Sequence, residues 1–190
     1  MKVRKGATEK AQKVKMILLD VDGVLTDGSI IYSSNCGEIK VFNAQDGFGI
    51  VRAIELGLKV GIITGRESDI IKKRANELGI TDLIQNAIDK VKPFETLASK
   101  YNLKPEQFCY VGDDILDIPL LKIVGFSAAP ANARSEVKRV VDYVASASGG
   151  NGAVREIIDY PDTLTPVTQI NFPSGNFTSM YIEVDAPCTS

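Results

Sequence analysis

Two aspartates separated by one residue, Asp20 and Asp22, come at the end of the apolar run that begins at Met16. Side chains at positions i and i+2 of an extended segment point to the same side. Two carboxylates held so close together resist ionising at the same time unless a cation or a shared proton lies between them. The pair therefore indicates a metal site or a proton-sharing pair, although an isolated pair of this kind also fits a strand end that caps a turn.

More polar side chains follow other apolar runs, and each set by itself also fits a turn, a helix cap or a solvated lysine. The sets are Thr64-Gly65-Arg66 after Leu58–Ile63, Asp113 and Asp114 after Phe108–Val111, Asp117 one helical turn later, and Lys90 and Lys92 at the start of the helix between these runs. Their joint occurrence in this order favours phosphoryl transfer. Carboxylate oxygens suit Mg²⁺, an aspartate can act as the nucleophile, and hydroxyl and ammonium groups can hold phosphoryl oxygens.

The composition excludes several other classes of protein. The chain of 190 residues has no histidine, so Ser-His and Cys-His triads and histidine zinc sites are impossible. A net charge of -2 gives no reason to expect nucleic acid as a partner, and no apolar run is long enough to span a membrane. No P-loop, dinucleotide-binding glycine motif or calcium loop is present. Three widely spaced cysteines suit neither a disulfide framework nor a zinc site, which favours the reducing cytoplasm.

Apolar runs alternate with amphipathic segments along the chain. Strands are expected at Met16–Val21, Leu58–Ile63, Leu83–Gln85, Phe108–Gly112, Gly125–Ala128 and Tyr143–Ala145. Helices are expected at Gly47–Leu56, Ser68–Leu78, Lys92–Tyr101, Ile115–Ile123, Ala133–Val140 and Ala153–Asp159. This rhythm predicts an α/β fold, a doubly wound three-layer sandwich with a mainly parallel sheet. Since such sheets bind ligands beyond the carboxyl ends of their strands, the polar sets above should meet at one edge.

One segment, residues 29–42, breaks this rhythm. Ser29–Ser33 and Glu38–Phe42 alternate around a turn at Ser34–Gly37, which predicts a β-hairpin directly after the aspartate pair. Such a hairpin could cover the site, mediate self-association or be a plain loop, and the pattern does not decide among these.

The two ends of the chain differ from its middle, and residues 1–160 are expected to form the α/β domain. The basic stretch Met1–Lys15 has no apolar segment of the kind found in a signal peptide, and we expect a solvated helix or arm. Pro161–Ser190 is rich in proline, threonine and serine, with few charges. We expect a tail outside the main core, with weak strand-like alternation at Thr178–Val184.

The chain resembles the haloacid dehalogenase superfamily of phosphatases in four motifs. They are Asp20-Val-Asp22-Gly23-Val-Leu-Thr26, Ile63-Thr64-Gly65, Lys90, and Gly112-Asp113-Asp114-Ile-Leu-Asp117. Within the superfamily, further segments resemble the 3-deoxy-D-manno-octulosonate 8-phosphate phosphatases. These segments are Asp27-Gly28, Phe42–Ile50, Ile62–Arg66 and Gly149–Glu156. The resemblance extends from Glu9 to Tyr160, and the tail beyond it does not look like the short helical ending usual in that group.

The resemblance implies a Mg²⁺-dependent phosphatase that works through an aspartyl-phosphate. Asp20 would be the nucleophile, and Asp22 would be the general acid and base. Mg²⁺ would be bound by Asp20, the backbone carbonyl of Asp22, and Asp113. Either Asp114 or Asp117 would orient the metal-bound waters or the active-site lysine.

The phosphoryl group would be held by Thr64 and a lysine. Many members of the superfamily have a Lys-Pro pair at this point, as in Lys92-Pro93, so the sequence leaves two candidates. We prefer Lys90 because its spacing after the preceding strand matches the superfamily better.

The implied substrate is 3-deoxy-D-manno-octulosonate 8-phosphate, in the synthesis of a lipopolysaccharide sugar. The residues expected to contact it are Thr64, Gly65, Arg66, Lys90, Asp46, Gly47, Gly150 and Gly152. Arg66 could pair with a carboxylate or phosphate, and relatives that act on nine-carbon sugar acid phosphates tend to have an acidic residue there. Amide groups of the Gly149–Gly152 loop could also bind a carboxylate, although a flexible linker fits the loop equally well.

Members of this branch lack a cap domain and resemble tetramers in which the hairpin packs between subunits, which implies a homotetramer. Three other functions remain to be weighed. A phosphatase of a nine-carbon sugar acid phosphate is the serious alternative. A non-catalytic assembly module has no need of both Asp20 and Asp22. A signalling receiver domain would place its acidic pair first and its lysine last, whereas here Asp113 and Asp114 follow Lys90.

Overall fold

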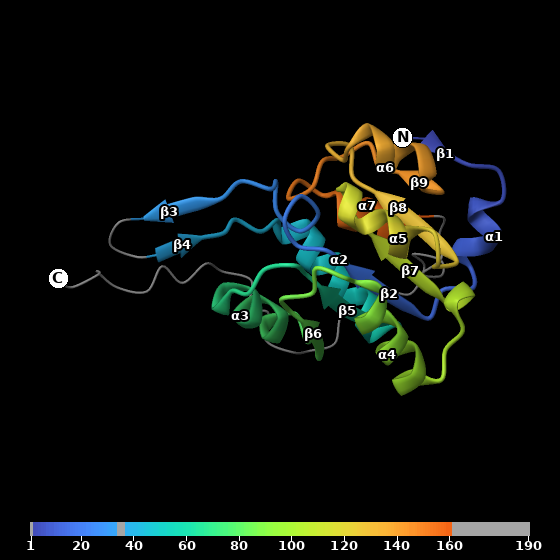
Figure 1. Ribbon diagram of the computed structural model, residues 1–190, viewed down its shortest axis with the longest axis horizontal. Helices are drawn as coiled ribbons and strands as arrows, with labels where there is room; N and C mark the ends of the chain where they lie inside the picture. The colour runs from blue at the N-terminus through green and yellow to red at the C-terminus, as the bar shows by residue number, and fades with distance from the viewer. Residues whose placement is uncertain (1, 34–36, 161–190) are drawn as a thin grey trace.

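A seven-stranded sheet forms the centre of the computed structural model, which describes residues 2–33 and 37–160 (Figure 1). The spatial order of the strands is β1-β9-β8-β7-β2-β5-β6. Their bounds are β1 Lys2–Val3, β2 Met16–Leu19, β5 Lys59–Ile63, β6 Asp82–Ile84, β7 Phe108–Val111, β8 Phe126–Ala129 and β9 Tyr143–Val144. All neighbouring strands run parallel except β1, which pairs antiparallel with β9.

The order of the strands reverses at β2. The chain proceeds from β2 to β5 and β6 on one side, and then crosses over to β7, β8 and β9 on the other. In an open α/β sheet, ligands bind outside the carboxyl ends of the strands at such a switch point. Asp20 is the first residue after β2, so it lies at this point.

Helices cover both faces of the sheet. Their bounds are α1 Ala7–Ala11, α2 Ala44–Glu55, α3 Asp69–Glu77, α4 Val91–Tyr101, α5 Ile118–Leu121, α6 Ser135–Val140 and α7 Ala153–Asp159, with 3-10 turns η1 Pro105–Gln107 and η2 Ile115–Asp117. Buried side chains of α1, α2, α3 and α7 belong to one core cluster, and those of α4, α5 and α6 belong to the other. In the described part of the chain, no helix is long and apolar enough to cross a membrane.

Strand β2 shows how the sequence builds both cores. All four of its side chains are buried, and they alternate between the two faces of the sheet. Ile17 and Leu19 pack into the cluster beneath α2 and α7, whereas Met16 and Leu18 pack into the cluster beneath α4 and α5. A parallel strand covered on both faces needs such a continuous apolar run, and the run ends where the carboxylates begin.

A two-stranded hairpin, β3 Ile31–Ser33 and β4 Gly37–Ile39, extends away from the body of the molecule (Figure 1). It belongs to a separate sheet and pairs Ile31 with Ile39 and Tyr32 with Glu38. Ile31 and Tyr32 expose 44% and 71% of their surface. A hairpin with such exposed apolar side chains is a surface that favours contact with another protein.

The doubly wound α/β fold and the hairpin are therefore confirmed, while several element boundaries were wrong. Strand β1 was not expected, because a lysine and a valine alone carry no strand pattern, and they pair with β9 only through tertiary contacts. The expected helix Ile115–Ile123 is divided into η2 and a short α5, with Pro119 in the first turn of α5. Helix α2 begins earlier than expected, at Ala44, because the Asn43 side chain accepts hydrogen bonds from Gln45 and Asp46 backbone N–H groups.

The N-terminal arm also differs from the expectation of a solvated segment, because α1 buries Ala7 and Ala11 against the core. The turn residues 34–36 and the tail 161–190, including the strand expected at Thr178–Val184, lie outside the described residues.

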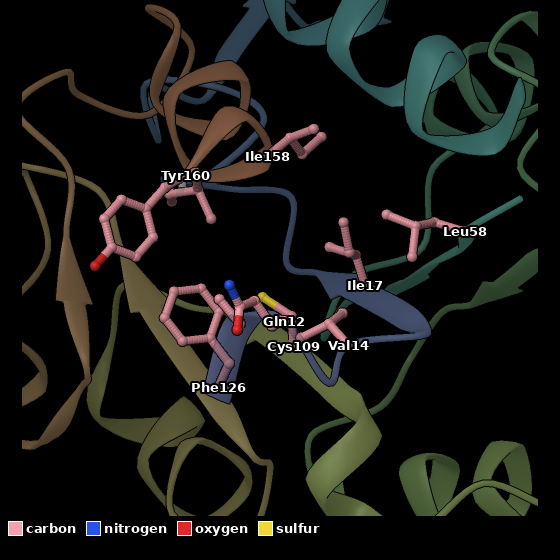
Figure 2. A pocket seen from close by; sticks show the side chains of 10 residues that line it. Gln12, Val14, Ile17, Leu58, Cys109, Phe126, Ile158 and Tyr160 are labelled. Carbon is pink, nitrogen blue, oxygen red and sulfur yellow. The ribbon is translucent and has the colours of Figure 1, made fainter. Parts of the chain in front are cut away.

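A small, mostly apolar pocket lies at the opposite end of the sheet from the aspartates (Figure 2). Its walls include Ile17, Cys109 and Phe126 near the starts of their strands, with Ile158 and Tyr160 from the end of α7 and beyond it. Among residues 2–33 and 37–160, no acidic or basic side chain lines it.

Candidate active site

Three carboxylates converge at the carboxyl ends of two neighbouring strands. Asp20 follows β2, Asp113 follows β7, and Asp117 lies in the 3-10 turn after β7. One oxygen from each of these side chains lies within 4.8 Å of the others. Strands β2 and β7 are paired in register, with Leu19 opposite Val111, so the sheet itself brings the first two together. The spacing is small enough for Asp20 and Asp113 to share one divalent ion.

Burial and mutual repulsion act on this cluster. Burial, offset in part by Lys90 and reinforced by the charge of Asp117, raises the pKa of Asp20 to about 6. Burial, together with the charges of Asp20 and Asp117, raises the pKa of Asp113 to about 7. In the described part of the chain, the three carboxylates of this cluster face the ammonium of Lys90, so negative charge exceeds positive charge within the cluster. An all-oxygen donor set with surplus negative charge fits Mg²⁺.

Asp117 uses both of its oxygens inside the protein. Its Oδ2 accepts hydrogen bonds from the backbone N–H groups of Asp113 and Asp114, at 2.9 and 3.0 Å. Its Oδ1 accepts from Lys90 Nζ at 2.6 Å and from the Tyr110 hydroxyl at 2.5 Å. The side chain is 1% exposed. This geometry places Asp117 behind the reacting edge, where it fixes the Asp113 loop and the lysine.

Lys90 is the lysine that the structure brings to the cluster. Its Nζ lies 2.7 Å from Asp20 Oδ2 and 2.6 Å from Asp117 Oδ1, and 5% of its side chain is exposed. Burial alone lowers the pKa of Lys90, but the two carboxylates outweigh it and raise that pKa above its ordinary value. Lys92 is 82% exposed, and its Nζ is 4.0 Å from Asp89. Of the two lysines that the sequence left as candidates, Lys90 therefore contacts the acidic cluster and Lys92 faces solvent.

Thr64 lies at the corresponding end of β5, the strand next to β2, and is buried. Its backbone is fixed on both sides, since its N–H donates to Ile84 and its carbonyl accepts from Ala87. Asp20 is fixed as well, because its Oδ1 accepts a 2.7 Å hydrogen bond from the Val21 backbone N–H. Threonine hydroxyl, ammonium and carboxylates therefore occupy a single edge, as the sequence predicted.

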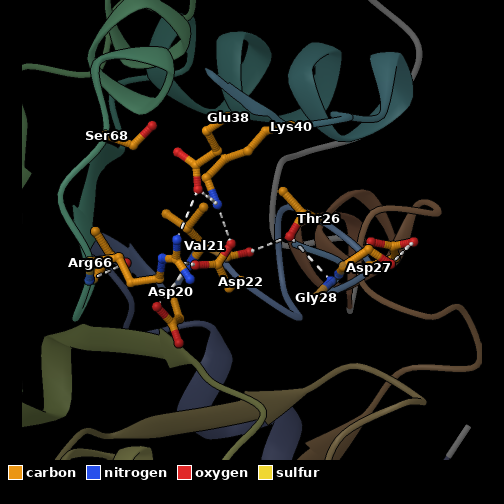
Figure 3. Close-up of polar contacts among 12 residues, drawn as sticks. Asp20, Val21, Asp22, Thr26, Asp27, Gly28, Glu38, Lys40, Arg66 and Ser68 are labelled. Carbon is orange, nitrogen blue, oxygen red and sulfur yellow. Dashed lines mark hydrogen bonds and ion pairs between the residues drawn. The ribbon is translucent and has the colours of Figure 1, made fainter. Parts of the chain in front are cut away.

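Asp22 faces a different set of charges from Asp20. Its Oδ1 lies 2.5 Å from Lys40 Nζ, and its Oδ2 lies 3.8 Å from Arg66 Nε (Figure 3). Arg66 in turn contacts Glu38 at 3.1 Å. Among the described residues, the Asp22 carboxylate does not belong to the acidic cluster. The two aspartates of the first motif are therefore directed to different partners.

Two of these charged residues, Glu38 and Lys40, were missed by the sequence reasoning. They come from β4 and the residue after it, and they lie two positions apart, so they share one face of the hairpin. That spacing on a strand next to the aspartate pair was the available signal. Asn132 was missed as well. Its side chain donates to the Gly23 carbonyl and accepts from the Gly149 N–H, which ties the first loop to the Gly149 loop.

The expected anion site in the Gly149–Gly152 loop was wrong, because its backbone amides already have acceptors. They donate to the Asn132 side chain, the Val24 carbonyl, the Ser148 carbonyl and Asp46 Oδ2. The loop packs against the backbone of Gly23, and it has no amide left over for a ligand.

Asp46 and Gly47 are also not brought to the reacting edge. Asp46 is 1% exposed, and its carboxylate accepts from the Gly152 and Arg155 N–H groups, so it caps α7. Gly47 is buried in α2, facing Arg74. Asp114 is exposed and caps its own 3-10 turn through a hydrogen bond from Ile115 N–H. Of the two acidic residues expected to support the site, only Asp117 therefore contacts it.

Comparison with known proteins decides the family. Residues 68–157 match the model of the haloacid dehalogenase-like hydrolases. The chain is 43% identical over 150 residues to 3-deoxy-D-manno-octulosonate 8-phosphate phosphatase KdsC of Escherichia coli K12, covering 79% of this chain and 80% of that protein. It belongs to the haloacid dehalogenase superfamily. The prediction that this chain is a phosphatase of the superfamily is therefore confirmed.

Solved structures of relatives have the same fold. A 3-deoxy-D-manno-octulosonate 8-phosphate phosphatase from Yersinia pestis superposes with a TM-score of 0.80 at 39% identity, covering 83% of this chain and 85% of that one. The enzyme of that name from Moraxella catarrhalis, in complex with magnesium ion, phosphate ion and a KDO molecule, superposes with a TM-score of 0.79 at 38% identity. In that pair, 82% of this chain and 90% of the other are covered.

Proposed function

We propose that this phosphatase hydrolyses 3-deoxy-D-manno-octulosonate 8-phosphate to the free eight-carbon sugar acid and phosphate, with Mg²⁺ as cofactor. Relatives named as phosphatases of this substrate match most of the chain, and one of their structures contains magnesium ion, phosphate ion and KDO. The observation in this protein that carries the proposal is the position of Arg66. The Arg66 side chain is 37% exposed and lies beside Asp22 and Glu38, so an incoming substrate carboxylate can reach its charge.

The chain's residues divide the reaction between them. Asp20 attacks phosphorus with one carboxylate oxygen, the bond from phosphorus to the sugar oxygen breaks, and Asp22 gives that oxygen a proton. In the second half, Asp22 takes a proton from water, the water oxygen attacks the aspartyl-phosphate, and Asp20 and phosphate are released. Lys90 and Thr64 hold the non-bridging oxygens, with Lys90 kept in place by Asp117.

Mg²⁺ would be held by Asp20, Asp113 and the backbone carbonyl of Asp22. When bound, it supplies positive charge that neutralises the phosphoryl oxygens. The fit rests on the carboxylate cluster, in which oxygens of Asp20, Asp113 and Asp117 lie within 4.8 Å of one another and face the ammonium of Lys90. Removal of the ion with a chelator should abolish phosphate release, and Mg²⁺ should restore it.

The decisive experiment is a phosphate-release assay on matched sugar acid phosphates. The eight-carbon acid 8-phosphate should have a kcat/KM at least about tenfold above a nine-carbon acid 9-phosphate, an energy difference of about 1.4 kcal/mol. Arg66→Met should raise KM for the sugar acid phosphate but leave turnover of p-nitrophenyl phosphate, which has no carboxylate, within a factor of two or so. Faster turnover of the nine-carbon acid would move the substrate to that alternative, and inactivity of the wild type on every phosphate would support a non-catalytic module.

We also propose that the enzyme is a cytoplasmic homotetramer assembled through its hairpin. Ile31, Tyr32, Ile39 and Val41 expose 44%, 71%, 41% and 66% of their surface, which is a large apolar area for a free hairpin. Light scattering should give four copies for the wild type and a smaller particle for Tyr32→Glu, because a buried unpaired carboxylate disrupts an apolar interface. A monomeric wild type would reject this assembly and leave the chemistry untouched.

A further inference from the structure

A lysine on the hairpin is buried against one of the two aspartates of the first motif. Lys40 follows β4, and only 1% of its side chain is exposed. Its Nζ lies 2.5 Å from Asp22 Oδ1 and 3.5 Å from Glu38 Oε1 (Figure 3). An ammonium group removed from water is costly unless it is paired and hydrogen-bonded. The carboxylates of Asp22 and Glu38 therefore hold the buried Lys40 ammonium beside the first motif.

These contacts close into a ring of alternating charge. Asp22 contacts Lys40, Lys40 contacts Glu38, Glu38 contacts Arg66 at 3.1 Å, and Arg66 returns to Asp22 at 3.8 Å. The four residues come from the loop after β2, from β4 and the residue after it, and from the loop after β5. Each oxygen of Asp22 faces a different cation, so rotation of its carboxylate would break one pair or the other.

The two cations of the ring differ in their exposure to solvent. The Arg66 side chain is 37% exposed, whereas that of Lys40 is 1% exposed. An incoming anion can reach Arg66 and draw it away from Asp22. Lys40 is shielded from such an anion and keeps its contact with Asp22 Oδ1. Lys40 is therefore the partner that can hold the carboxylate while substrate is bound.

We infer that Lys40 is a positioning residue that holds the Asp22 carboxylate in the orientation needed for proton exchange with the leaving oxygen. The inference rests on the proposed role of Asp22 as general acid and base. It also gives the hairpin a part in catalysis, since the strand that carries the exposed apolar side chains also delivers Lys40. Proton transfer is sensitive to distance and direction, and a misplaced acid loses much of its effect.

This role predicts a dependence on the leaving group. When the bond from phosphorus to oxygen breaks, the alkoxide of a sugar is strongly basic and needs the proton of Asp22. The p-nitrophenolate leaving group is weakly basic and departs without one. A loss of positioning should therefore slow cleavage of an alkyl phosphate much more than cleavage of p-nitrophenyl phosphate. A general loss of packing would slow both alike.

The test compares Lys40→Met and Lys40→Arg with wild type in single-turnover experiments, with enzyme in excess so that only the first half-reaction is followed. Lys40→Met should slow release of the alcohol from the sugar acid phosphate by about a hundredfold, within the usual range for a general acid. Release of p-nitrophenol should slow by less than about fivefold, and KM for the sugar acid phosphate should change by less than about threefold. Lys40→Arg should recover at least about a tenth of the wild-type alkyl rate because it keeps the charge.

Lys100→Met is the matched control. Lys100 also forms an ion pair with an aspartate, at 2.6 Å from Asp82, but this pair lies at the start of β6, at the edge opposite Asp20. Its loss should leave both single-turnover rates unchanged. If Lys40→Met does not fold, Lys40→Gln, which keeps the length and polarity of the side chain, takes its place in the same comparison.

Equal slowing on both leaving groups, or full activity of Lys40→Met on the alkyl phosphate, overturns the inference. The substrate assignment is tested separately. If wild type prefers a nine-carbon acid, the leaving-group comparison is made on that alkyl phosphate and keeps its meaning. Conversely, a wild type selective for the eight-carbon acid together with an unaffected Lys40→Met would leave the proposed function standing and reject only the role of Lys40.

Discussion

The carboxylate of Asp113 occupies the space that a side chain at Gly23 would need. A β-carbon at Gly23 would overlap Asp113 Oδ2, far inside any permitted contact. Gly23 also has a φ of 90°, in the left-handed region that favours glycine. The glycine of the first motif is thus required by the aspartate of the last motif, which approaches from the neighbouring strand.

We therefore predict that Gly23→Ala weakens Mg²⁺ binding. The added methyl group must displace the Asp113 carboxylate, which changes the spacing that lets the cluster share an ion. Disturbing the groups that orient a metal ligand typically costs about 10–100-fold in affinity. Titration calorimetry with Mg²⁺ should show this loss, and the Mg²⁺ dependence of phosphate release should shift to higher concentration by a similar factor.

Gly57→Ala is the control for backbone strain. Gly57 has the same φ of 90°, but nothing lies within 4 Å of the position of its β-carbon. This variant should lose about 1 kcal/mol of stability from the left-handed backbone and keep its Mg²⁺ affinity. Equal Mg²⁺ affinity of the two variants would mean that the contact with Asp113 has no effect on the metal site.

Mg²⁺ binding should release protons and strengthen as pH rises. The folded-state pKa values of Asp20 and Asp113 are raised to about 6 and about 7 from 3.8. The stability that these protonated groups give the metal-free protein is full below 3.8 and is lost as pH rises through these values. Mg²⁺ needs both carboxylates ionised, so its affinity should increase between about pH 5 and about pH 7.5 and then level off.

The measurement is calorimetry in two buffers of different ionisation enthalpy, which counts the protons released. We expect one to two protons at about pH 5.5 and close to none at about pH 8. The rise in melting temperature caused by Mg²⁺ should be correspondingly larger at the higher pH. An affinity that does not change with pH would contradict the raised pKa values of these two buried carboxylates.

Much of the fold and the acidic edge could be predicted from sequence, because both depend on patterns within short segments. Each parallel strand is a short apolar run, and the polar residue that follows it must lie at the carboxyl edge. Asp20, Thr64 and Asp113 were placed together on this basis. Their convergence needs only the rule that parallel strands end on the same side.

The missed features depend on contacts between distant segments. Lys40 and Asp46 look alike in sequence, as charged residues near the aspartate pair, yet one lies against Asp22 and the other caps α7. The Gly149–Gly152 loop shows the same difficulty. Its glycines suggest an anion site, but the residues that take up its amides, Asn132 and Asp46, are known only once the elements are packed.

Lys90→Met should reduce kcat/KM by about 10²–10³, the usual effect of removing a group that stabilises developing charge. Its ammonium lies 2.7 Å from Asp20 Oδ2, so it is within reach of a phosphoryl group bound to that carboxylate. Steady-state phosphate release measures the loss. The variant should have a lower kcat as well as a higher KM, because the contact between the Lys90 ammonium and the phosphoryl oxygens strengthens as these oxygens gain charge in the transition state.

Lys92→Met provides the comparison for Lys90, since the two lysines are close in sequence but differ in burial. The exposed Lys92 pairs only weakly with Asp89, at 4.0 Å, and such pairs contribute at most about 1 kcal/mol to stability. The kcat/KM of Lys92→Met should stay within about twofold of the wild-type value. If Lys92→Met were the inactive variant, the lysine of the third motif would have to be reassigned.

Asp46→Ala should destabilise the protein without removing a group from the substrate site. Its carboxylate is buried and accepts from two backbone amides at the start of α7, so its loss leaves those donors without a partner at a cost of about 1–3 kcal/mol. Urea unfolding measures this cost. Asp159→Ala, which removes only the exposed ion pair with Arg155, should cost less than about 0.5 kcal/mol. If instead Asp46→Ala kept full stability and raised KM for the sugar acid phosphate about tenfold or more, Asp46 would be a substrate contact after all.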